Sequence, residues 1–251
     1  MKSVFYSVLS IGALSLSTSV FAGICDTTHG KNSLLKKLGY DDEYTYFDCR
    51  ALPNTTNTSV VAVAEFDPDP QEETSGTYDL HLFKINSQTG AVITQYKKAD
   101  SFVSDAVRVT GIALDTAAYQ LNPNKRAIGV RVDSSGASRV YPYSSTLLNL
   151  YDVNAKKTVL SHLVVNLHRG ENDADCNSDW EEHKGLLHLL TTKTQGYPDI
   201  RVSYSINTEG TVKKKGECMD LPAKQEKVSF VMKFDGKKYQ VPKPFKDIYT
   251  Y

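Results

Sequence analysis

The stretch YDLHLFKINSQTGAVI (residues 78–93) shows the pattern that recurs through most of the chain and decides its fold class. Apolar and polar residues alternate up to Ile85, a turn led by Asn86 and closed by Gly90 follows, and a second run begins at Ala91. Alternation with a period of two is typical of a β-strand with one buried face, and Asn and Gly favour tight turns. The stretch therefore predicts two antiparallel strands joined as a hairpin.

The same plan recurs in LLNLYDVNAKKTVL (147–160) and, more loosely, in IRVSYSINTEGTV (200–212) and VSFVMKFDGKKYQV (228–241). The last of these contains Asp235-Gly236, the sharpest turn signal, because both positions of such a turn require φ > 0. Runs of this texture predict strands at residues 60–66, 78–85, 91–96, 108–114, 127–132, 146–153, 158–165, 186–190, 200–206, 228–234 and 238–241.

One helix is predicted, at residues 32–40, where three leucines fall on one face and Gly39 provides a stop. Residues 67–73, DPDPQEE, are interpreted as an acidic loop. Strands do not alternate with helices, which disfavours a doubly wound parallel fold. No linker divides the chain after residue 22, so residues 23–251 are expected to form a single all-β domain.

Hairpin units of this kind resemble the outer hairpins of β-propeller blades. The stretch TTKTQGYPDIRV (191–202) resembles FG-GAP-type propeller repeats of the form D-x-N-x-D-G-x-x-D followed by apolar residues. Gly196, Asp199 and the IRV that follows match, whereas threonine, lysine and glutamine replace the first three calcium ligands. The resemblance implies a blade-like shape without calcium at this position. Because the turns are unevenly spaced, an irregular propeller-like domain and a β-sandwich both remain open.

The first residues, MKSVFYSVLSIGALSLSTSVFA (1–22), have the pattern of a signal peptide. Lys2 precedes a short apolar run, and Val20 and Ala22 are the small residues that a secretory peptidase requires before Gly23. An uncleaved anchor is the alternative. No later stretch is apolar enough to span a bilayer, so we expect a periplasmic or secreted chain without integral membrane association.

All four cysteines, Cys25, Cys49, Cys176 and Cys218, lie after the leader. An even number in an exported chain indicates disulfides, and four cysteines allow three pairings. We predict the pairing of nearest neighbours, Cys25 with Cys49 and Cys176 with Cys218. The chain lacks the Cys/His spacing of a zinc site, so the cysteines are interpreted as structural.

Charge and motifs narrow the function classes. The 29 basic and 29 acidic residues give no net field, which speaks against binding of nucleic acid or of an anionic membrane. The chain contains neither a G-x-S-x-G nor an H-E-x-x-H motif. An enzyme is therefore the less favoured interpretation, although a triad assembled in space needs no motif.

The stretch ENDADCNSDWEEH (171–183) places six carboxylates around one cysteine and the only tryptophan. Oxygen-bearing side chains recur at every second position from Asp173 to Glu181, as in the early part of an EF-hand loop. Ser178 and Lys184 stand where that loop needs Gly and Glu. The favoured interpretation is a solvated acidic loop; a calcium site and a pair of working carboxylates are the alternatives. The candidate binding residues are Glu171, Asp173, Asp175, Asp179, Trp180 and Glu181.

A second candidate surface lies in KRAIGVRVDSSGASRVYPYS (125–144). Arg131, Arg139 and Tyr141 are of the residue types that anchor protein interfaces. An exposed strand and an ordinary Ser/Gly loop are the alternative for this stretch.

At the level of general style, a disulfide-tied β frame with polar loops resembles periplasmic inhibitor and immunity proteins. The resemblance implies a non-enzymatic exported protein that binds another exported protein, such as a toxin or a cell-wall hydrolase. The acidic stretch would meet a cationic partner, and no cofactor is expected apart from the calcium alternative. The rival hypothesis is a carboxylate-dependent hydrolase or carbohydrate-active enzyme, with Trp180 as an apolar wall.

Overall fold

The computed structural model of the chain describes residues 23–41, 45–173 and 175–246, so the predicted signal peptide lies outside the described residues. The elements in chain order are α1 (Thr28–Lys37), β1 (Thr45–Ala51), β2 (Thr58–Asp69), β3 (Glu72–Asn86), β4 (Val92–Ser104), β5 (Val107–Asp115), β6 (Gln120–Asn122), β7 (Lys125–Arg126), β8 (Ile128–Gly136), β9 (Tyr143–Asp152), β10 (Lys157–Asn172), β11 (Ser178–Thr194), β12 (Tyr197–Lys214), β13 (Glu217–Asp220), β14 (Lys224–Met232) and the 3-10 helix η1 (Lys243–Phe245).

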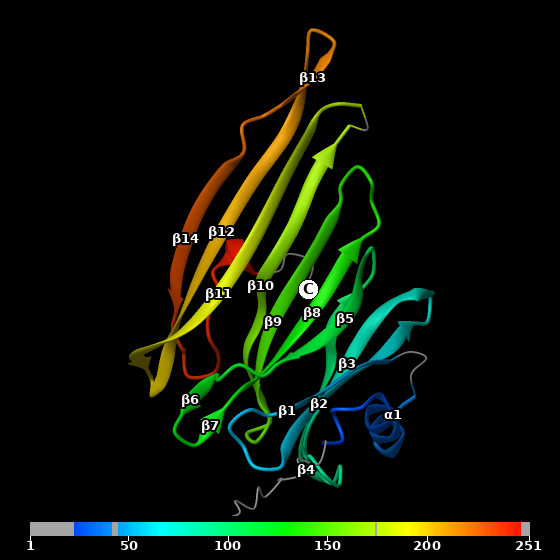
Figure 1. Cartoon of the computed structure of the whole chain (residues 1–251), viewed down its shortest axis with the longest axis vertical. Coiled ribbons are helices and arrows are strands. Elements are labelled where there is room, and N and C mark those ends of the chain that lie inside the picture. The colour runs from blue at the N-terminus through cyan, green and yellow to red at the C-terminus, as the bar shows by residue number, and fades with distance from the viewer. Residues whose placement is uncertain (1–22, 42–44, 174, 247–251) are drawn as a thin grey trace, which may run out of the picture.

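Two antiparallel sheets carry the fold (Figure 1). Sheet A has the order β1-β2-β3-β4, and sheet B has the order β13-β12-β11-β10-β9-β8-β5. Strand β14 also pairs with β12, further along the edge that β13 occupies. Most neighbours in the sheets are neighbours in the chain, so both sheets are largely meanders, and neither closes on itself.

The main core lies where sheet A packs on one end of sheet B. Its inward-facing residues recur at every second position along each strand, as the alternation in the sequence predicts. They include Val60, Ala62, Ala64, Leu80 and Leu82 from sheet A, and Ile128, Val130, Val132, Leu147 and Tyr151 from sheet B.

Helix α1 covers the outer face of sheet A. Val61 and Val63, which alternate with the residues of the main core, pack with Leu34 and Leu35 of the helix. The disulfide between Cys25 and Cys49 fastens the start of the helix to β1. This outer layer has a small core of its own.

The helix begins at Thr28, earlier than the predicted residue 32. The side chain of Thr27 accepts a hydrogen bond from the Gly30 N–H at 3.0 Å, which makes Thr27 the N-cap. The apolar pattern starts only at Leu34 and so could not show this first turn. Gly39, with φ of 88°, follows the end of the helix as expected.

A second core lies on the other side of β9 and β10, under the C-terminal segment. Tyr204 of β12 is its centre: the ring stacks on Phe245 of η1, with centroids 4.6 Å apart, and the hydroxyl donates to the Val164 carbonyl. Tyr204 also lies directly opposite Gly185, where a Cβ atom would be 2.8 Å from the ring. The glycine thus makes room for the aromatic ring on the neighbouring strand.

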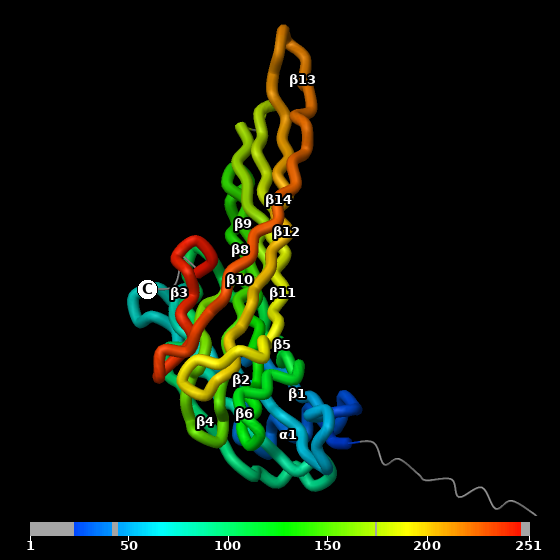
Figure 2. Tube along the Cα trace, turned by 90° about the vertical axis from the view of Figure 1, so that its left-hand side faces the viewer, coloured from blue at the N-terminus to red at the C-terminus, as the bar shows by residue number. Residues whose placement is uncertain are grey.

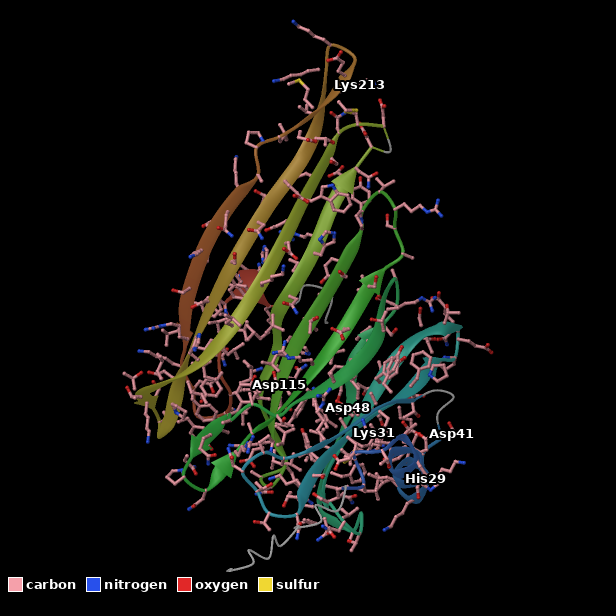
Figure 3. The ribbon with its side chains drawn as sticks, viewed as in Figure 1. His29, Lys31, Asp41, Asp48, Asp115 and Lys213 are labelled. Atoms are coloured by element: carbon pink, nitrogen blue, oxygen red, sulfur yellow. A yellow bond between two sulfur atoms is a disulfide. The ribbon has the colours of Figure 1, made fainter. Side chains whose placement is uncertain are left out.

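Beyond these cores sheet B continues as a single layer, seen edge-on in Figure 2. The far ends of β10, β11, β12 and β14 form this projecting part, and the hairpin of β12 and β13 forms its tip. Figure 3 shows Lys213 at the tip and Asp115 near the other end of the sheet. The disulfide between Cys176 and Cys218 ties the turn between β10 and β11 to β13.

The structure confirms an all-β fold with one short helix and confirms both predicted disulfides. The disulfides are those of a protein from an oxidising or extracellular compartment. The choice between a propeller-like and a sandwich arrangement stays a prediction, because both large sheets are open. Among the helices of the described ranges, none is long and apolar enough to cross a membrane.

Two local predictions were wrong. Residues 67–73 are not a loop, because β2 and β3 continue to Asp69 and Glu72 and pair with each other there. Pro68 is tolerated because β1 pairs only as far as Glu65, so this part of β2 has one open edge. Residues 238–241 contain no strand: Tyr239 makes a single bridge to Phe234.

Candidate functional site

The acidic stretch forms a hairpin rather than the loop that the sequence predicted. Glu171 lies in β10 and Asp179 in β11, directly opposite each other in register. Trp180 pairs with Gly170, and Glu181 pairs with Arg169. Both faces of the sheet are exposed here, so the strands carry polar residues on both sides and lack the apolar alternation that identifies strands elsewhere. Only the residues between Asn172 and Ser178 lie outside the two strands.

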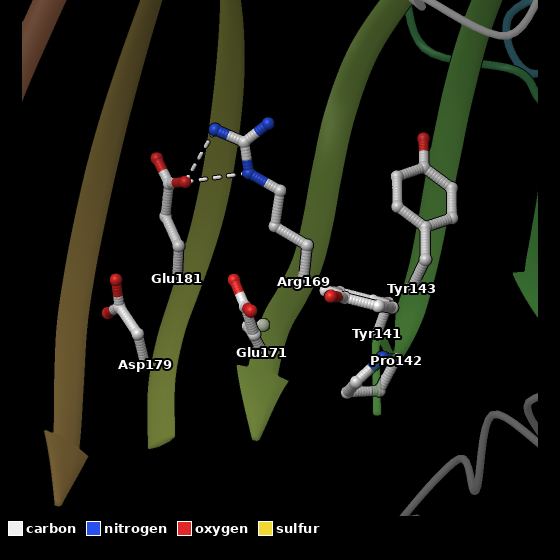
Figure 4. A pocket seen from close by; sticks show the side chains of 8 residues that line it. Tyr141, Pro142, Tyr143, Arg169, Glu171, Asp179 and Glu181 are labelled. Carbon is white, nitrogen blue, oxygen red and sulfur yellow. Dashed lines mark hydrogen bonds and ion pairs between the residues drawn. The ribbon is translucent and has the colours of Figure 1, made fainter. Parts of the chain in front are cut away.

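Successive side chains of a strand point to opposite faces, and this divides the acidic residues. Glu171, Asp179 and Glu181 lie on one face, together with Tyr143 of β9. They surround a hollow of about 360 Å³, drawn in Figure 4 and called the acidic hollow below. Its lining consists of Tyr141, Pro142, Tyr143, Arg169, Gly170, Glu171, Asp179 and Glu181.

Glu181 is the most firmly held carboxylate of the acidic hollow. Arg169 reaches one of its oxygens with Nε at 2.7 Å and Nη2 at 2.6 Å, and Nε2 of the buried His183 lies 2.5 Å from the other. Burial acts to raise the pKa of Glu181, but the hydrogen bonds from His183 and Arg169 outweigh it and leave the pKa lowered. Glu181 is therefore ionised at neutral pH and is unsuited to serve as a general acid.

Glu171 and Asp179 differ from Glu181 because both are exposed and neither has an ion-pair partner among the described residues. Side chains directly opposite on antiparallel strands have Cβ atoms roughly 5 Å apart, and two like charges at that distance repel each other. With one guanidinium against three carboxylates, the acidic hollow has a net charge of −2. The arrangement favours a cation between the two unpaired carboxylates.

Asp173 and Asp175 lie in the turn and do not line the acidic hollow. Each of them makes other contacts. Oδ1 of Asp173 accepts the N–H groups of Asp175, Cys176 and Asn177 at 3.0, 2.9 and 3.0 Å. Asp175 pairs with Lys213 at 2.6 Å. Asp173 and Asp175, the first two oxygens of the EF-hand-like spacing, are therefore held by separate partners, and no group of three His, Cys, Asp or Glu residues in the described ranges could hold a metal ion.

The turn is expected to loosen in acid. The side-chain hydrogen bond from Asn177, followed by the backbone N–H groups, lowers the pKa of Asp173 below its ordinary value of 3.8. A lowered folded-state pKa means that this stabilisation is complete above the ordinary pKa and is lost as the pH falls through the lowered one. The protection of the Cys176 and Asn177 amides against hydrogen exchange, relative to their intrinsic rates at each pH, should fall across that range. Asp173→Asn should abolish the dependence; an unchanged profile in this variant would assign it to another group.

The structure does not bring Arg131, Arg139 and Tyr141 together into the second predicted surface. Arg131 pairs with Asp115 of β5 at 2.8 Å, away from the projecting part of sheet B. Arg139 lies between β8 and β9, and its carbonyl accepts a hydrogen bond of 2.7 Å from the Asn172 side chain. Tyr141 is 59 % exposed and contributes to the acidic hollow instead. The structure thus joins Tyr141 to the acidic residues rather than to the two arginines.

Arg169 of the acidic hollow, and His168 on the opposite face, were not identified from the sequence as binding residues. The signal that could have found Arg169 is charge: it is the basic residue nearest before the acidic stretch, two positions ahead of Glu171. Trp180 points to the face opposite the acidic hollow, beside His168. The candidate residues of this one stretch therefore lie on two opposite faces of the sheet.

Comparison of the chain with protein-family models, curated proteins and solved structures finds no match. The resemblances to propeller repeats and to periplasmic inhibitor and immunity proteins therefore stay predictions. The function has to be argued from the geometry of the site.

Proposed function

We propose that the protein is an exported, non-enzymatic binding protein whose acidic hollow receives a basic side chain of another exported protein. The observation that carries the proposal is the opposed pair Glu171 and Asp179, two exposed carboxylates without a cationic partner among the described residues. A lysine or arginine from a partner would relieve their repulsion. Tyr141 and Tyr143, at the rim of the hollow, add aromatic surface of the kind that anchors interfaces.

The position of the hollow supports a role in recognition. Its residues on β10 and β11 lie at the ends of these strands, in the part of sheet B that projects from the cores as a single layer (Figure 2). The Cys176–Cys218 disulfide and the ion pair between Asp175 and Lys213 stiffen the adjoining turn. A rigid site loses less conformational entropy when it binds. A leader with the pattern of a signal peptide fits a periplasmic or secreted location.

An inhibitor or immunity protein is the kind of binding protein that we favour within this class. Its target would be a toxin or cell-wall hydrolase with a basic residue at the rim of its cleft. The hydrolase alternative gains less support, because Glu181 is ionised and engaged by Arg169 and His183. Catalytic carboxylate pairs need one member with a raised pKa.

The charge of the hollow can be tested with a penta-arginine peptide, measured by fluorescence anisotropy at low salt. Changing Glu171→Gln and Asp179→Asn together is expected to weaken binding about tenfold, because two partly exposed charge contacts are lost. The loss should lie chiefly in the association rate and shrink as salt is added.

The matched control removes two carboxylates from the outer edge of the same sheet, by Glu217→Gln in β13 and Glu226→Gln in β14. Both residues are exposed and lie outside the hollow, so this variant should bind like the wild type. Equal weakening by both pairs of changes would contradict the proposal, as would equal binding of penta-glutamate. A partner captured from an extract of exported proteins should be lost with the same double change in the hollow.

A further inference from the structure

The opposite face of the projecting sheet carries a row of planar polar side chains. His168, Glu182, Asn207 and Gln225 come from β10, β11, β12 and β14 and stand next to one another in register. Asn207 Nδ2 donates to Glu182 at 3.4 Å, and Gln225 Nε2 donates to Asn207 Oδ1 at 3.2 Å. These hydrogen bonds are long, so the side chains could exchange them for bonds to a ligand at little cost.

Trp180 flanks this row and belongs to none of the three hydrophobic cores. Its ring occupies the space over Gly170, where a Cβ atom would lie 2.7 Å from the indole. The His168 ring is nearly parallel to the indole, with centroids 5.3 Å apart and an angle of 24° between the planes. Gly170 and His168 thus fix the orientation of an aromatic ring that the folding cores do not use.

Two hollows on this face adjoin each other and are together called the polar trough below. A hollow of about 370 Å³ adjoins Trp180, Asn207 and Gln225. A second hollow, of about 350 Å³, extends across β8 and β9 and is lined by hydroxyl groups, including those of Ser135, Ser144 and Thr146. Both hollows share His168 and Glu182, so the trough crosses much of the width of the sheet.

The charges of the polar trough are of mixed sign and partly satisfied within it. Lys184 pairs with Glu182 at 2.8 Å, and Asp133 accepts a hydrogen bond of 2.6 Å from Thr146. Glu209 and Lys224 add one charge of each sign. Apart from Glu181, which Arg169 pairs, three carboxylates and two ammonium groups line the trough, so its net charge is −1 against −2 for the acidic hollow. Both signs occur along the trough, and it therefore suits an uncharged ligand.

We infer that the polar trough binds an uncharged oligosaccharide. Amide, carboxylate and hydroxyl side chains provide the mixed donors and acceptors that sugar hydroxyl groups require. An aromatic ring beside them offers an apolar surface to the C–H face of a pyranose. Two adjoining hollows side by side across the strands fit a chain of sugar units better than a compact ligand. This site is independent of the protein-binding function proposed for the other face.

Trp180 provides the readout, because it is the only tryptophan of the chain. Neutral tetrasaccharides of glucose, N-acetylglucosamine, mannose and galactose are titrated into the protein, with tetragalacturonate as an acidic comparison. At least one neutral sugar is expected to change the tryptophan emission saturably at up to millimolar concentration. The acidic sugar is expected to bind more weakly than the best neutral one.

The variant Asn207→Ala with Gln225→Ala is expected to weaken this binding about tenfold, because hydrogen bonds to the sugar are lost. His188→Ala is the control, since His188 lies on the same face of β11 but outside the polar trough, and it should bind like the wild type. Circular dichroism confirms that each variant is folded. A neutral panel without any saturable response, tighter binding of tetragalacturonate, or unchanged binding by the double variant would overturn the inference.

Discussion

Replacing Tyr204 by alanine is expected to lower the free energy of unfolding by about 4 kcal/mol. The side chain is 2 % exposed and stacks with Phe245, and its hydroxyl donates to the buried carbonyl of Val164. Alanine would leave a cavity over Gly185, which has no side chain to fill it. Urea denaturation followed by circular dichroism measures the loss.

The matched variant Tyr204→Phe keeps the ring and removes only the hydroxyl. Its expected cost is about 1–2 kcal/mol, the usual cost of leaving a buried carbonyl without its donor. The C-terminal segment should detach in the alanine variant, since Phe245 loses its stacking partner, and limited proteolysis should then cut earlier near residue 240. Similar losses in both variants would show that the hydroxyl, not the ring, holds this core together.

Removing the disulfide between Cys25 and Cys49 by two serine substitutions is expected to cost about 3.5 kcal/mol. The two cysteines are 24 residues apart, and the cross-link restricts the unfolded chain by that loop. Both cysteines are also buried in the small core under α1. We expect this core to unfold together with the rest of the protein, so the loss of stability should appear in global unfolding. The shift of the urea midpoint measures it.

The same change at Cys176 and Cys218 is the control. Their separation of 42 residues is larger, and loop entropy alone would predict a slightly larger cost. This disulfide, however, lies at the end of the single-layer part of sheet B, where strands can open without exposing a core. We therefore expect faster hydrogen exchange at the tip and a smaller shift of the global midpoint. Equal midpoint shifts for the two disulfides would contradict this local character.

Sequence pattern predicted the strands that bury at least one face and failed where burial stops. The run around Val60–Val63 packs on a core with each face and is a continuous apolar stretch, whereas around Leu80–Leu82 apolar and polar residues alternate; both patterns indicate a strand. Strand β13, Glu217–Asp220, is exposed throughout, and no such pattern marks it. The same reason explains why the acidic hairpin was interpreted as a loop. Polar residues that are exposed on both faces of a strand show no hydrophobic periodicity from which the strand could be predicted.

The site could be predicted only as a set of residues, not as a geometry. The sequence shows that Glu171, Asp179 and Glu181 are carboxylates. That these three share one face of the sheet, opposite the face of Trp180, depends on the register of β10 with β11. Tyr141 and Tyr143 reach the acidic hollow from the loop before β9 and from β9 itself, by pairings that alternation alone does not specify. The disulfide between Cys176 and Cys218 was predictable because few pairings were available.

The meander order of the two sheets bears on how the chain assembles. In sheet A, and from β8 to β12 in sheet B, each strand pairs with its predecessor in the chain. Bringing two such strands together closes only the short loop between them, and the entropy lost on closing a loop grows with its length. Hairpins can therefore form locally and add to one another. The pairing of β5 with β8, the stacking of Phe245 on Tyr204 and the contacts between the two sheets, such as the hydrogen bond from Tyr46 to Val109, require longer loops to close. Such contacts add to the topological cost of reaching the native state.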